Sequence, residues 1–146
     1  MRSKLSWSDA APIGMRVALA AGFLSAVADR FGLWGPLGTS GVAWGEFDKF
    51  LEYTATILPF LPPALVAVAG WTATLAEIVL AVALLVGVRV RLAAIASGLL
   101  LLTFAIAMTT SLGFEPPLTY SVWTAAAGAF LLSQSSKVLM PASPAA

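Results

Sequence analysis

A single carboxylate, Glu77, is the strongest candidate for chemistry in this chain. It lies near the middle of an apolar stretch that runs from Ala64 to Val88. A charged side chain at the centre of a bilayer costs roughly 2.5–3.5 kcal/mol on insertion scales, so it normally faces a partner or a polar cavity inside the protein. Glu77 is therefore the first residue to test for function.

Two helix faces combine small and polar residues around this acid. On the second apolar stretch they are Gly70, Thr74, Glu77 and Ala81, and on the first they are Gly22, Ser25 and Asp29. Small residues let membrane helices approach closely, so we expect both faces to point into one interior, where Asp29 and Glu77 line a shared pocket. Arg30 is turned about 100° from Asp29 on a helix, and we expect it to snorkel outward.

Three interpretations of Glu77 remain open. It is a structural carboxyl that joins helices through groups such as Thr74, Ser25 or Tyr120. Alternatively, it is the acid of a ligand pocket that hydrogen-bonds a quinone-like carbonyl or relays its proton. The third interpretation is a proton or cation coupling site in a small transporter. No span carries a second acid toward the cytoplasmic side, so the sequence shows no complete relay.

Aromatic and sulfur-containing side chains supply a candidate pocket wall. They are Trp71, Phe104, Met108, Tyr120 and Trp123, which we place in the outer halves of their spans. Such a wall suits a flat aromatic headgroup. It equally suits ordinary packing at an outer membrane interface, where tryptophan and tyrosine are common. With Asp29, Arg30, Thr74 and Glu77 these residues form the candidate ligand-binding set, and no catalytic residue is assigned.

The composition excludes several classes of chemistry. The chain has no cysteine and no histidine, which removes thiol–disulfide exchange, iron–sulfur clusters, histidine- or thiolate-ligated haem and most zinc or copper sites. We expect no metal site, no covalently bound cofactor and no binding of nucleic acid. Any redox chemistry then depends on a bound cofactor, for which a quinone is the candidate, or on a partner chain.

The elements that hold these residues are membrane helices. Hydrophobic residues make up 60% of the 146 residues and charged residues 10%, and the mean hydropathy is +0.93, whereas soluble domains are about 45–50% apolar and about 25% charged. Four apolar stretches are long enough to cross roughly 30 Å of hydrocarbon; they cover about 14–33, 63–88, 92–112 and 118–134. We therefore predict one transmembrane domain over 1–146, an all-α antiparallel four-helix bundle with a flexible tail at 141–146.

The segment between the first two spans is not a simple loop. Glycines interrupt its first part, whereas 46–61 has helical periodicity. Its apolar side carries Phe47, Phe50, Leu51, Thr54, Ile57, Leu58 and Leu61, and its polar side carries Asp48, Lys49 and Glu52. This pattern predicts an amphipathic helix lying in the membrane interface. It serves either as a lid on the bundle or as a docking surface for an extracytoplasmic partner.

The basic residues indicate an orientation. Six lie on the side of both termini, namely Arg2, Lys4, Arg16, Arg89, Arg91 and Lys137, and Lys49 and Arg30 lie on the other. This distribution predicts cytoplasmic termini, in a bacterium in the inner membrane. The first stretch ends in an Ala-Val-Ala pattern that resembles a signal-peptide cleavage site, but the acidic Asp9 before it favours a retained helix.

A sparse pattern extends over about 14–132 and consists of Arg16, Gly22, Asp29-Arg30-Phe31-Gly32, Glu77, Gly87 and Arg89-Val90-Arg91-Leu92-Ala93-Ala94. With this pattern the chain resembles the DoxX family of small four-helix membrane proteins. Many members carry a lone lysine after a glycine where this chain has Asp29-Arg30, so only Glu77 is carried over. Some relatives are named as subunits of a thiosulfate:quinone oxidoreductase, and others belong to membrane complexes for thiol and oxidative stress.

The resemblance implies an accessory or quinone-interacting subunit of a membrane redox system, with a membrane or periplasmic redox protein or a second copy as partner. Without a redox-active side chain, we do not expect catalysis by this chain alone. The alternative is a non-catalytic scaffold or assembly factor that docks a partner through the extracytoplasmic 34–61 segment. A small proton- or cation-coupled transporter is the third interpretation.

Overall fold

The computed structural model describes residues 7–135, and these residues form six α-helices and no strand. The helices are α1 (Trp7–Arg30), α2 (Phe47–Ile57), α3 (Pro63–Val86), α4 (Val90–Leu112), α5 (Glu115–Thr119) and α6 (Val122–Gln134). Three of them are long and apolar enough to cross a membrane, over Ala10–Arg30, Pro63–Val86 and Val90–Leu112. The chain is thus an all-α integral membrane protein, as its composition predicts.

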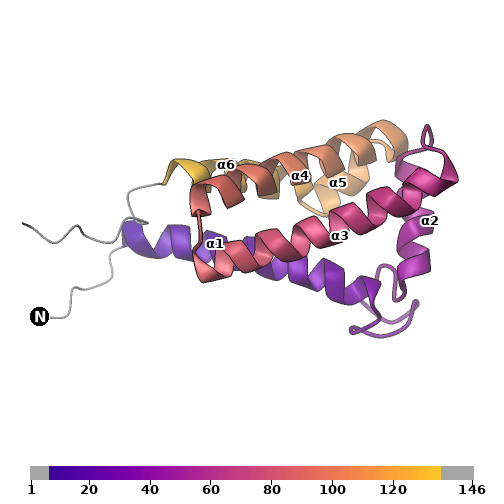
Figure 1. The fold of residues 1–146 in the computed structure, drawn as a ribbon, viewed down its shortest axis with the longest axis horizontal. Helices are drawn as coiled ribbons and strands as arrows, with labels where there is room; N and C mark the ends of the chain where they lie inside the picture. Colours follow the sequence, from indigo (N-terminus) through magenta and orange to yellow (C-terminus); the bar gives the residue numbers. More distant parts are fainter. Residues whose placement is uncertain (1–6, 136–146) are drawn as a thin grey trace, which may run out of the picture.

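The helices α1, α3, α4 and α6 lie along the long axis of the molecule (Figure 1). α1 packs against α3, and α4 packs against α6. The start of α1, the turn between α3 and α4 and the end of α6 share one end of the molecule, which we call the terminal end. α2 and α5 lie at the opposite end, where α2 runs across the long helices. We call this opposite end the outer end.

Local backbone signals set the limits of α3 and α4. Pro63 is the first residue of α3, where its missing N–H and fixed φ are tolerated. Gly87 ends the helix in the left-handed conformation with a φ of 83°. The predicted spans 63–88 and 92–112 therefore differ from α3 and α4 by only two residues, at the shared turn.

The first and last predicted spans need larger corrections. α1 extends back to Trp7 rather than 14, and it ends at Arg30 because Gly32 turns the chain with a φ of 72°. The predicted span 118–134 is not continuous: α5 ends at Thr119, and Ser121 has a left-handed φ of 56°. α6 has 13 residues, about 20 Å at 1.5 Å per residue, which is shorter than a full span.

The amphipathic helix at the outer end is confirmed, with shorter limits. α2 covers Phe47–Ile57 rather than 46–61, because a residue that precedes a proline, here Leu58, is disfavoured in helical conformation. Its predicted apolar side faces the bundle, since Phe50, Thr54 and Ile57 are buried. Gly70 on α3 allows this close approach, because a Cβ there would lie 2.5 Å from Cδ2 of Leu51.

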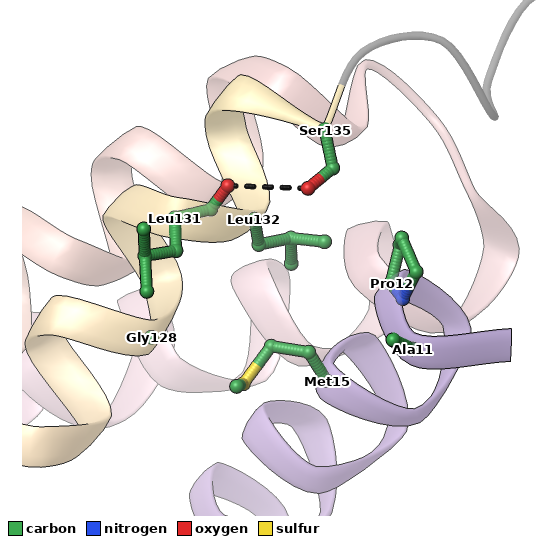
Figure 2. Close-up of a pocket in the computed structure, with 7 residues that line it drawn as sticks. All are labelled: Ala11, Pro12, Met15, Gly128, Leu131, Leu132 and Ser135. Atoms are coloured by element: carbon green, nitrogen blue, oxygen red, sulfur yellow. Dashed lines mark hydrogen bonds between the residues drawn. The ribbon is translucent and has the colours of Figure 1, made fainter. Parts of the chain in front are cut away.

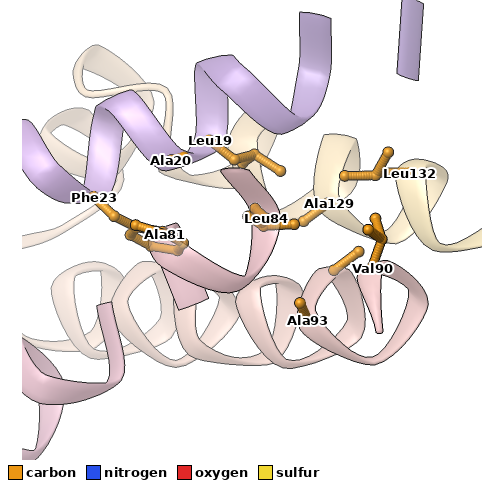
Figure 3. Packing of buried hydrophobic residues seen from close by; sticks show 10 residues of the cluster. Leu19, Ala20, Phe23, Ala81, Leu84, Val90, Ala93, Ala129 and Leu132 are labelled. Carbon is orange, nitrogen blue, oxygen red and sulfur yellow. The ribbon is translucent and has the colours of Figure 1, made fainter. Parts of the chain in front are cut away.

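The hydrophobic core occupies the half of the bundle near the terminal end. Figure 3 shows its side chains converging from four helices: Leu19, Ala20, Phe23, Ala81, Leu84, Val90, Ala93, Ala129 and Leu132. Arg16 closes this end, because its Nε donates to the Leu84 carbonyl at 2.8 Å and its Nη2 to the Leu85 carbonyl at 3.3 Å. A cation there satisfies carbonyl groups that the last turn of α3 leaves free.

Candidate functional site

Glu77 is buried in the bundle and is paired with Arg30. Nη2 of Arg30 lies 2.7 Å from Oε1 of Glu77, and the two side chains are 3% and 2% exposed. Arg30 is the last residue of α1, whereas Glu77 lies in the middle of α3. The prediction that Arg30 snorkels outward is wrong. Its long side chain instead reaches into the bundle, because a buried acid without a cation would be costly in free energy.

Three further groups hold the Arg30 guanidinium in place. Nη1 donates to Oγ1 of Thr74 at 2.9 Å, and that hydroxyl donates to the Gly70 carbonyl at 2.8 Å. The guanidinium carbon lies 3.9 Å from the centre of the Phe50 ring and 5.5 Å from that of Trp44. These contacts suit an arginine, whose planar head stacks on rings while its N–H groups bind oxygen atoms. The ion pair therefore joins α1, α3 and the outer helix α2.

Asp29 has a different set of partners. Its Oδ2 accepts hydrogen bonds from the backbone N–H groups of Ala43 at 2.9 Å and Trp44 at 3.2 Å, and its Oδ1 accepts one from Gly45 at 3.2 Å. Asp29 is 5% exposed. The carboxylate thus holds the loop before α2 against the end of α1. The hydrogen bonds of Asp29 thus go to the loop, whereas Glu77 pairs with Arg30.

The predicted interior face is correct for α3, but for α1 only Asp29 of the predicted face is buried. Gly70, Thr74, Glu77 and Ala81 are all buried, as their spacing predicts. Gly22 and Ser25, in contrast, are exposed, and the buried positions of α1 include Phe23, Val27, Asp29 and Arg30. The Ser25 hydroxyl accepts a hydrogen bond from Nε1 of Trp34 at 3.2 Å instead of contacting Glu77. The buried side of this helix is therefore apolar at Phe23 and Val27 and becomes polar at its end, at Asp29 and Arg30.

The residues of the predicted aromatic wall differ widely in their exposure. Trp71 is 47% exposed and packs on Phe47, with ring centres 4.3 Å apart. Tyr120 is 69% exposed, Met108 is buried, and Phe104 and Trp123 are half-buried. The rings nearest to the Arg30 guanidinium come from Phe50 and Trp44, which the sequence interpretation did not include in the site.

An apolar pocket of about 280 Å³ lies at the terminal end, and its lining includes neither Arg30 nor Glu77. Figure 2 shows it between the first turns of α1 and the last turns of α6. Its lining residues are Ala11, Pro12, Met15, Gly128, Leu131, Leu132 and Ser135. None of these seven described residues is charged, so the described part of the lining suits apolar groups.

Three buried polar atoms have no hydrogen-bond partner within residues 7–135: Nε of Arg30, Oε2 of Glu77 and Oγ of Ser97. The sequence interpretation did not single out Ser97. No group of three or more histidine, cysteine, aspartate or glutamate side chains in the described part of the chain could hold a metal ion. The site around the ion pair therefore offers one free carboxylate oxygen and one free N–H donor.

Comparisons with family models, with curated proteins and with solved structures found no match for this chain.

Proposed function

We propose that the chain is a non-catalytic accessory protein of a membrane complex, similar in kind to DoxX proteins, and that it docks a partner at its outer end. In this proposal α6 completes a four-helix bundle in a bacterial inner membrane, and both termini are cytoplasmic. The partner is a membrane or periplasmic redox protein. The observation that carries the proposal is the set of contacts from Asp29 and Arg30 that attaches the outer segment 31–62 to the bundle.

Charged contacts from within the bundle fix this outer segment. Asp29 binds the backbone before α2, and Arg30 binds Thr74 and Glu77 beneath Phe50. Contacts to charged groups contribute about 1.5–3 kcal/mol each, more than neutral hydrogen bonds. A segment held in this way keeps one shape, which lowers the entropy lost when a partner binds.

The same end exposes large apolar side chains to its surroundings. Leu33 is 75% exposed, Phe60 76% and Phe114 70%. The outer segment 31–62 also carries three acids, Glu46, Asp48 and Glu52, against one base, Lys49. Apolar groups bordered by acidic ones are typical of a protein contact in which charge sets the orientation of the partner. We therefore expect the partner to present a basic rim.

The test compares the removal of an exposed apolar side chain at the outer end with the removal of one in the middle of the bundle. Phe60→Ala removes a side chain at the outer end, whereas Val79→Ala removes one that is 65% exposed in the middle of α3. Each variant is extracted gently from native membranes, and its complexes are sized by native electrophoresis. The proposal predicts a complex that is lost in the Phe60 variant and retained in the Val79 variant. Equal behaviour of both variants would contradict it.

A second candidate function is quinone binding beside the ion pair. Nε of Arg30 is a free donor for a quinone carbonyl, and Phe50 and Trp44 present rings next to it. Native mass spectrometry of the full chain tests this candidate directly. A retained quinone mass that is lost in Glu77→Gln but kept in the surface variant Glu52→Gln would support it. A chain without any quinone mass would count against it.

A further inference from the structure

Two of the unpaired polar atoms belong to buried side chains of α3 and α4, and these two helices are in contact. The core cluster includes Leu84 and Ala81 on α3 and Val90 and Ala94 on α4. One helical turn farther from the shared turn, on the same side of each helix, lie Glu77 on α3 and Ser97 on α4. Both residues are fully buried, with exposures of 1% and 0%.

The two residues also lie at nearly the same height in the bundle. Glu77 is nine residues before the end of α3 at Val86, and Ser97 is seven residues after the start of α4 at Val90. At 1.5 Å per residue, the levels differ by about 3 Å in two antiparallel helices. Oε2 of Glu77 and Oγ of Ser97 nevertheless make no direct hydrogen bond. Polar atoms that face each other beyond direct reach are commonly joined by a water molecule.

The chemistry of the three unpaired atoms matches what one water needs. A carboxylate oxygen accepts a hydrogen bond, the Nε–H of an arginine donates one, and a serine hydroxyl does either. Buried waters typically make about three hydrogen bonds to polar groups that the protein leaves unsatisfied. The Phe50 ring does not replace such a bond, because a stacked ring contacts the face of the guanidinium and Nε–H points along its plane.

We propose that Glu77, Ser97 and Arg30 form a binding site for a buried water molecule in the middle of the bundle. The water accepts from Nε of Arg30, donates to Oε2 of Glu77 and exchanges a hydrogen bond with Oγ of Ser97. It connects α4 to an ion pair that otherwise joins only α1, α2 and α3. This inference is independent of the docking role at the outer end.

The test observes the Arg30 side chain in the full chain, reconstituted in lipid nanodiscs with ¹⁵N-labelled arginine. Five arginines give few Nε–H signals, and Arg30→Lys identifies the one from Arg30. We expect magnetisation transfer from water to this Nε–H in the unmodified protein. We also expect it to be lost in Ser97→Ala and retained in Ser97→Thr, which keeps the hydroxyl.

Ser133→Ala is the matched control, because the buried Ser133 hydroxyl already donates to the Phe130 carbonyl at 2.6 Å. The water signal at Arg30 should be unchanged in this variant. No transfer from water in the unmodified protein would overturn the site. Transfer that persists undiminished in Ser97→Ala would overturn it as well, since Ser97 would then take no part.

Discussion

Nη2 of Arg30 lies 2.7 Å from Oε1 of Glu77, and both side chains are almost wholly buried. The pair connects the outer end of α1 to the middle of α3, with Thr74 and Phe50 around the guanidinium. Burying two charges costs free energy, and their attraction recovers that cost only in good geometry with further hydrogen bonds. The pair therefore specifies how the helices fit together more than it adds to overall stability.

We expect the two single substitutions of this pair to be far more harmful than a joint apolar replacement. Arg30→Gln and Glu77→Gln each leave one buried charge without its partner, which should lower the free energy of unfolding by about 3–5 kcal/mol. The double variant Arg30→Met, Glu77→Leu removes both charges and should lose much less than the sum. Reversible unfolding of the purified protein in mixed micelles measures all three values.

The exposed pair Lys49 and Glu52, 2.8 Å apart, is the control for this cycle. Its separate and joint replacements should change stability little, because surface ion pairs contribute little. If the losses at Arg30 and Glu77 simply add in the double variant, the two residues do not act as a pair.

Helix limits were predictable where a single residue determines the backbone. Pro63 and Gly87 bound α3 closely, because proline favours a first helical turn and glycine favours a left-handed end. The break at Ser121 was not predictable, since a serine with a φ of 56° has no comparable local preference. The chain there follows the packing of α6 on α4, which is a tertiary effect.

The buried acid at Glu77 was also predictable, but its partner was not identified. Helical periodicity gives the direction in which a side chain leaves the helix, but not where the end of a long side chain lies. The angle between Arg30 and Asp29 therefore predicts an outward Arg30, although its guanidinium lies inside the bundle. The need to balance a buried charge indicates the partner of Glu77 better than periodicity does. A carboxylate within a span requires a cation, and Arg30 lies at the end of the helix that packs on α3. The role of Ser97 depends on how α3 and α4 align, which the sequence pattern does not reveal.

Asp29→Asn should loosen the loop before α2. In the unmodified protein the backbone N–H groups of Ala43, Trp44 and Gly45 all donate to the Asp29 carboxylate. An asparagine keeps one acceptor oxygen, but its NH₂ group is a donor and must face at least one of these N–H groups. Hydrogen bonds to charged groups contribute about 1.5–3 kcal/mol. We expect faster amide hydrogen exchange at 43–45, measured by mass spectrometry. Asp48→Asn, on the exposed side of α2, should leave this exchange unchanged, and equal rates in both variants would argue against the role of Asp29.

Two glycines of the outer segment should respond differently to alanine. Gly45 has a φ of 71°, and a Cβ there would lie 2.5 Å from the backbone nitrogen of Leu37. Gly41 has a φ of 83°, but a Cβ there meets nothing within 4 Å. Gly41→Ala should therefore lower the free energy of unfolding by only about 1–2 kcal/mol, the cost of placing an alanine in the left-handed conformation. Gly45→Ala must also move the backbone, so limited proteolysis should cleave 34–46 faster in this variant, and equal cleavage rates would contradict the contact.

Tyr53 on α2 should ionise at higher pH in the folded protein than in the unfolded chain. Burial of its ring raises the pKa of the phenol above 10.0, and the nearby Tyr120 raises it further. Because the folded state favours the neutral phenol, this contribution to stability is fully present below the unfolded pKa and is lost as the pH rises through the folded pKa.

Tyr53 and Tyr120 are the two tyrosines of the sequence, so Tyr120→Phe isolates Tyr53 in an absorbance titration of tyrosinate. The midpoint should lie above 10.0 in the folded variant and return to about 10 in denaturant. A midpoint that does not change on unfolding would show that α2 does not bury this ring against the bundle.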